Sequence, residues 1–104
     1  MTPTWKITPT HMDGHPAVEF QRPWDAEPTT IRVLDPDRVR TDLEALERIE
    51  AANSGWFAGF LHRHVPVTHL DGLWAQHPGD VLVEADTVTD LVALIAAARR
   101  EHGL

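Results

Sequence analysis

Histidine is the residue type in this sequence whose spacing comes closest to that of a chemical site. Among the 104 residues, His62, His64 and His69 fall within one short segment. On a strand, His62 and His64 would project from the same face, and a turn at Pro66 would return His69 towards them. Three converging neutral imidazoles can bind Zn²⁺ or another transition metal. The segment therefore offers one hypothesis, a metal- or histidine-dependent enzyme centred on these residues. We favour the other interpretation, three unrelated, partly exposed histidines near the end of an edge strand, because H-x-H alone is a weak signal.

Other catalytic patterns are absent from the sequence. It contains no G-x-S-x-G motif, no Walker-type loop, no dinucleotide fingerprint and no H-E-x-x-H motif. The lack of cysteine also excludes thiolate zinc sites and cysteine nucleophiles. A pair such as His69 and Asp71 would need a nucleophile or a second carboxylate in a recognisable frame to act in acid–base catalysis. We therefore expect a protein without catalytic activity and without a cofactor.

Tryptophan is the second residue type that points to a function. The chain has four tryptophans, three phenylalanines and no tyrosine. Trp24 stands between Pro23 and Asp25 in a polar loop, where burial of a large ring is least assured. Exposed tryptophans serve as anchors in protein interfaces, because one ring buries a large area at a small entropy cost. We therefore predict a partner-binding surface at Trp24, with Arg22 and Asp25 in its polar rim.

The other tryptophans receive different interpretations. Trp74 lies in an ambiguous segment shortly before Pro78, so it joins Trp24 as a candidate partner-binding residue. Trp56 begins a short apolar run, which predicts a position in the core, and Trp5 is expected to cover one face of a strand. For Trp24 and Trp74 the alternative is that the ring folds its own loop back onto the core.

The composition limits the classes of partner. The formal net charge is −7 and the nine Lys and Arg residues are scattered, which argues against nucleic acid as a partner. Acidic residues of the first predicted helix, including Glu47 and Glu50, share that helix with arginines, so we interpret them as a solvated surface. No apolar run is long enough to cross a bilayer and the first residues do not resemble a secretory signal. We therefore expect a cytoplasmic protein that does not bind membranes.

The first predicted helix has signals at both ends. Asp35 can accept hydrogen bonds from the first free N–H groups, and Pro36 suits the first turn, where its missing N–H is harmless. Gly55 follows the last apolar position and is free to adopt the left-handed conformation that ends many helices. These signals predict a helix over about residues 36–53. Its expected buried stripe comprises Val39, Leu43, Leu46 and Ile49.

The second predicted helix covers about residues 88–102. Thr87 and Asp90 have the spacing of a capping box, and Gly103 follows the last turn. Its expected buried stripe comprises Val88, Leu91, Val92, Ile95 and Ala98.

The remaining elements complete the predicted fold. Residues 4–8 and 17–22 alternate between polar and apolar side chains around an Asp13-Gly14 turn signal, which predicts a β-hairpin. Further strands are expected at about 31–33, 55–61 and 81–85, and residues 70–75 fit one or two helical turns. No internal repeat is apparent. The sequence therefore predicts a single domain over 1–104 with an α+β fold, an N-terminal hairpin plus a small mixed sheet packed by the two long helices.

These observations favour a small acidic protein-binding module without catalytic activity. It would work as an adaptor, an immunity or antitoxin-like protein, or an accessory protein of a phage or plasmid. The expected partner is another protein or a second copy of the chain, since a homodimer is reasonable for so small a domain. The enzyme centred on the three histidines is the alternative.

Overall fold

The computed structural model describes residues 4–61 and 66–104 and has the predicted α+β fold. The first sheet is antiparallel and consists of β1 (Lys6–Met12), β2 (His15–Gln21) and β3 (Thr29–Arg32), in that order. The predicted hairpin is confirmed. Asp13 and Gly14 form its turn with φ angles of 54° and 78°, the left-handed conformations that a two-residue hairpin turn requires.

The second sheet is also antiparallel and consists of β4 (Phe57–Gly59), β5 (Leu73–His77) and β6 (Val81–Ala85). The structure thus has two antiparallel sheets where the sequence suggested one mixed sheet beside a hairpin. The prediction of helical turns at residues 70–75 was wrong. Leu73 and Ala75 are buried while Trp74 between them is half-buried, and this period of two is that of a strand with one covered face.

Both helices begin and end as the sequence predicts. Helix α1 (Pro36–Ala52) is capped by the Asp35 side chain, which accepts from the backbone N–H of Arg38. Helix α2 (Val88–His102) is capped by Thr87, whose hydroxyl accepts from the N–H of Asp90. Neither helix in the described ranges is long and apolar enough to cross a membrane.

The chain repeats one order of elements, three strands followed by a helix, although no repeat is visible in the sequence. Helix α1 also buries the predicted Ile49; the buried positions that the two helices share lie four, eight and eleven residues after the N-cap. They are Val39, Leu43 and Leu46 in α1, and Leu91, Ile95 and Ala98 in α2. The sequence placed Val92 on the buried stripe of α2, but Val92 is 49% exposed. The observed stripe is narrower than predicted, and Val92 lies beside it.

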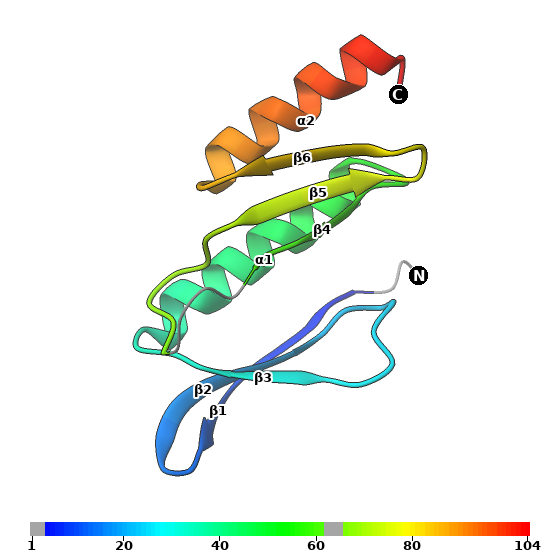
Figure 1. The fold of residues 1–104 in the computed structure, drawn as a ribbon. Helices are drawn as coiled ribbons and strands as arrows, with labels where there is room; N and C mark the ends of the chain where they lie inside the picture. The colour runs from blue at the N-terminus through cyan, green and yellow to red at the C-terminus, as the bar shows by residue number, and fades with distance from the viewer. Residues whose placement is uncertain (1–3, 62–65) are drawn as a thin grey trace.

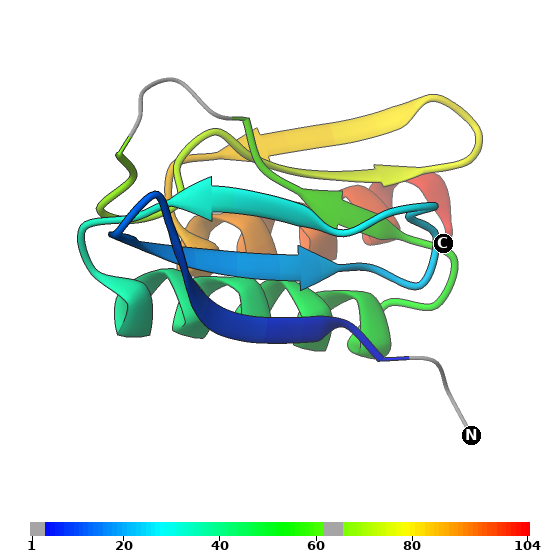
Figure 2. The ribbon, with the colours of Figure 1, turned by 90° about the horizontal axis from the view of Figure 1, so that it is seen from below.

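The two sheets enclose α1 from two sides. Figure 1 shows the first sheet below α1 and the second sheet in front of it, with α2 above β6, and Figure 2 shows the first sheet from below with α1 behind it. A parallel bridge between Val33 and Val67 links β3 to the segment that leads into β5. The buried side chains of both sheets and both helices form one hydrophobic core.

Candidate functional site

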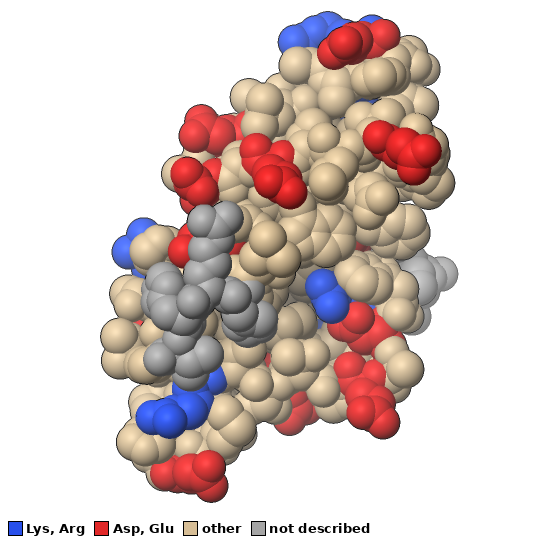
Figure 3. All heavy atoms as spheres, viewed as in Figure 1, with Lys and Arg blue, Asp and Glu red and all other residues tan. Residues whose placement is uncertain are grey.

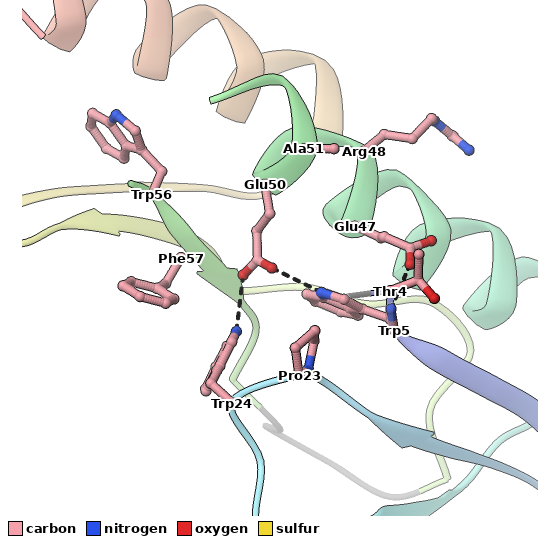
Figure 4. Close-up of a pocket in the computed structure, with 10 residues that line it drawn as sticks. All are labelled: Thr4, Trp5, Pro23, Trp24, Glu47, Arg48, Glu50, Ala51, Trp56 and Phe57. Carbon is pink, nitrogen blue, oxygen red and sulfur yellow. Dashed lines mark hydrogen bonds between the residues drawn. The ribbon is translucent and has the colours of Figure 1, made fainter. Parts of the chain in front are cut away.

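A cavity of about 440 Å³ opens between the last turns of α1, the start of β4 and the loop that follows β2. Figure 4 shows the side chains around it. Its walls are mainly aromatic. The carboxylates of Glu47 and Glu50, two residues of α1, also line it. The lining residues comprise Trp5, Trp24, Trp56, Phe57, Glu47 and Glu50, together with Thr4, Pro23, Arg48 and Ala51.

Glu50 holds three separate parts of the chain together at this cavity. Its Oε1 accepts from the indole Nε1 of Trp5 at 2.8 Å, and its Oε2 accepts from the indole Nε1 of Trp24 at 3.3 Å. The same Oε2 accepts from the backbone N–H of Ala58 at 2.8 Å. All three donors are N–H groups, so Glu50 serves as the acceptor in every one of these bonds. The solvated role expected for Glu50 was therefore wrong.

Trp24 is fixed in orientation while 42% of it stays exposed. The guanidinium of Arg22 lies 4.0 Å from the centroid of its ring, within the range of a cation–π contact. Phe57 meets the ring edge to face, with centroids 5.7 Å apart and planes at 82°. Together with the bond to Glu50, these contacts hold the indole on three sides.

Arg22 is in turn fixed by Asp25. Arg22 donates from Nε to Asp25 Oδ2 at 2.7 Å and from Nη2 to Asp25 Oδ1 at 3.0 Å. The two side chains are only 17% and 12% exposed. Burial raises the pKa of Asp25, but the hydrogen bonds and the charge of Arg22 outweigh it and hold the pKa below its usual value. The predicted rim residues thus form a half-buried ion pair that supports the ring.

Trp74, the other predicted partner-binding tryptophan, lies on the outer face of the second sheet. It pairs with Gly59 on β4 and Glu84 on β6, and its indole covers Gly59. Two residues along each strand, on the same outer face, Gln76 pairs with Phe57 on β4 and with Leu82 on β6. Residues paired across antiparallel strands share a face, so Phe57 connects Trp24 with this outer surface.

We call the surface formed by Trp24, Phe57, Trp74 and Leu82 the tryptophan face. Phe57 and Leu82 are 41% and 53% exposed, and Trp74 is half-buried. Figure 3 views this side of the molecule, where uncharged surface predominates over β5 and β6 and Asp and Glu side chains lie around it. The predicted residues Trp24 and Trp74 therefore belong to one side of the molecule.

Comparisons with protein-family models, with curated proteins and with solved structures found no match to this chain.

The histidine hypothesis receives no support from the described residues. His69 is exposed, and His62 and His64 lie outside the described ranges. Within residues 4–61 and 66–104, no three His, Asp or Glu side chains converge to hold a metal ion. The convergence of His62, His64 and His69 is therefore untested.

The site residues that the sequence did not identify include Phe57 and Leu82 of the tryptophan face and the two carboxylates, Glu47 and Glu50. Phe57 was assigned to a buried strand, and its exposure depends on β4 forming the edge of a sheet with an open outer face. Glu50 had one usable signal. It follows the buried Ile49 on α1 in a chain with four indole N–H donors, and indoles inside a protein need an acceptor.

Proposed function

We propose that this protein is a small acidic protein-binding module of the cytoplasm, without catalytic activity, and that it binds its partner through the tryptophan face. The observation that carries the proposal is the fixed orientation of the exposed Trp24 ring, with Arg22 on one face and Phe57 at its edge. An exposed aromatic ring that is already ordered loses little conformational freedom on binding, so more of its burial appears as affinity.

The surroundings of Trp24 support the same proposal. Asp25 and Arg22 form a polar border beside the ring, and Phe57 and Leu82 extend the apolar area across the second sheet. An apolar centre with a polar rim is the usual anatomy of a protein interface. The partner is either another protein or a second copy of the chain.

The test is a selection from a displayed library of random peptides, followed by affinity measurements on variants. We expect selected peptides to lose at least about tenfold in affinity, or about 1.4 kcal/mol, on Trp24→Ala and on Phe57→Ala. Leu94→Ala is the matched control, because Leu94 on α2 is 41% exposed, as much as Phe57. Equal losses for Leu94→Ala and Trp24→Ala would contradict the proposal.

Sedimentation velocity of the free protein separates the two kinds of partner. A dimer that dissociates on Trp24→Ala but not on Leu94→Ala identifies a second copy as the occupant of the tryptophan face. A monomer at all concentrations leaves another protein as the partner.

A further inference from the structure

We propose that the cavity between Trp5, Trp24 and Phe57 binds a cationic side chain, an arginine of the partner protein, against Glu47 and Glu50. This inference rests on the proposed function, since it specifies which chemical group the partner presents beside the tryptophan face.

The first argument is the composition of the walls. Three indoles and one phenyl ring line a space of about 440 Å³, enough for a guanidinium and its alkyl stem. Aromatic faces attract cations through their quadrupole, and the attraction grows when water is excluded. A purely apolar ligand would also fit such walls, so the choice of a cation depends on the charged groups.

The second argument is that, among the residues that the structure describes, the two carboxylates have no ion-pair partner. In residues 4–61 and 66–104, neither Glu47 nor Glu50 forms an ion pair with Lys or Arg. Glu47 uses only Oε2, which accepts from the backbone N–H of Trp5 at 2.6 Å. Arg48 also lines the cavity, but Figure 4 shows its side chain extending away from Glu50. Within the described residues, neither carboxylate is therefore neutralised by a direct ion pair, and the guanidinium of Arg22, 6.0 Å from the centroid of the Trp5 ring, is paired with Asp25.

The third argument is that the same chemistry already occurs next to the cavity, where the guanidinium of Arg22 lies 4.0 Å from the Trp24 ring centroid and 6.0 Å from that of Trp5. Arg22 stacks on the Trp24 ring at 4.0 Å while donating two hydrogen bonds to Asp25. A guanidinium suits this combination, because it is planar, stacks on indole and donates in a fixed fork to carboxylates. An incoming arginine would meet an indole and carboxylates in the cavity in the same way. The net charge of −7 also favours the approach of a basic partner.

The test uses the four indole N–H signals of ¹⁵N-labelled protein, assigned with single Trp→Phe variants. The probe is a blocked pentapeptide with one arginine among four glycines, added at low ionic strength. We expect saturable shifts of the Trp5 and Trp24 signals, whose N–H groups both donate to Glu50. The matched peptide with neutral citrulline in place of arginine should leave them unchanged. Absence of shifts, or equal shifts with citrulline, would overturn the proposal.

Variants identify the carboxylates. Glu50→Gln and Glu47→Gln should each lower the affinity for the arginine peptide at least about tenfold, because each variant loses one charge-assisted hydrogen bond. Glu44→Gln is the control on the same helix, because Glu44 lies beside Arg40 and does not line the cavity. If Glu50→Gln unfolds the protein, the affinity of Glu47→Gln for the arginine peptide still tests whether a carboxylate of the cavity binds the cation. Unchanged affinity in Glu47→Gln would contradict the assignment of the second carboxylate.

A parallel titration with tetramethylammonium chloride separates a small ammonium ligand from a protein side chain. At least tenfold tighter binding of tetramethylammonium than of the arginine peptide would overturn the assignment to a protein partner. Selected library peptides separate this inference from the proposed function. Selected peptides that require Trp24, lack basic residues and bind Glu47→Gln with unchanged affinity would refute the cation site. They would still support the proposed protein-binding function.

Discussion

Trp24 and Glu50 are joined by a hydrogen bond of 3.3 Å from the indole Nε1 to Oε2, across a separation of 26 residues. The bond connects the loop after β2 with the last turn of α1. Because Glu50 also accepts from Trp5 and Ala58, a single carboxylate fixes the N-terminal segment, the loop and β4 around one cavity. The exposed ring is thereby ordered by the same group that gives the cavity its charge.

Glu50→Ala is expected to lower the free energy of unfolding by about 2–4 kcal/mol, because three N–H donors lose a charged acceptor and some are partly shielded from water. Urea unfolding followed by circular dichroism measures the change. The control Glu44→Ala, also on α1, should change it by less than about 0.5 kcal/mol. Similar losses in both variants would show that the bonds to Glu50 add nothing to ordinary helix effects.

Gly59→Ala is expected to destabilise the second sheet, because a Cβ at this position would lie 2.7 Å from Cε2 of Trp74. The indole must move, and such overpacking costs about 1–3 kcal/mol. Thermal unfolding and the Trp74 indole signal are the measurements. Gly14→Ala is not a suitable control, because the φ of 78° at Gly14 would strain an alanine whatever the space around it. The double variant Gly59→Ala with Trp74→Ala should recover part of the loss, and no recovery would exclude the steric cause.

Asp25→Asn should destabilise the protein at neutral pH and progressively less in acid. The folded-state pKa of Asp25 is lowered, so the carboxylate stabilises the fold above its unfolded pKa of about 3.9 and loses this contribution as the pH falls through the folded value. Urea unfolding of both proteins between pH 7 and pH 3 measures the difference. A difference that widens below pH 4 would mean that the sign is reversed.

Leu91→Ala and Val92→Ala should differ although the residues are adjacent. Leu91 is fully buried and should lose about 2–5 kcal/mol on truncation, whereas Val92 is 49% exposed and should lose less than about 1 kcal/mol. Chemical denaturation of the two variants is a direct check on the orientation of α2. A larger loss for Val92→Ala would show that the helix is rotated from its present position.

The helices were predictable because their signals are local. Asp35 and Thr87 each act within three residues of their own position, so the sequence alone places the caps. The second sheet was harder, because the strand character of Leu73–His77 depends on pairing with Val81–Ala85 and on a covering helix. Short apolar runs do not distinguish a strand from a helical turn by periodicity alone.

The candidate site was only half predictable for the same reason. The exposure of Trp24 follows from its polar, proline-flanked loop, which is a local property. Its contacts with Phe57 and Glu50 join distant segments and have no counterpart in residue spacing. Asp25 lies beside the ring as expected, but its bidentate contact with Arg22, which leaves it half-buried, could not be predicted.

In both described sheets, every strand pairs only with its neighbour in the sequence. Pairing between neighbours in the sequence carries a smaller entropic penalty than pairing between distant segments, so each group of three strands can form early during folding. The bridge from Val33 to Val67 and the bonds of Glu50 to Trp5 and Trp24 join distant segments and must form later. The cavity that Glu50 closes with Trp5 and Trp24 is therefore among the last parts of the molecule to assemble, and we expect it to be among the first to open.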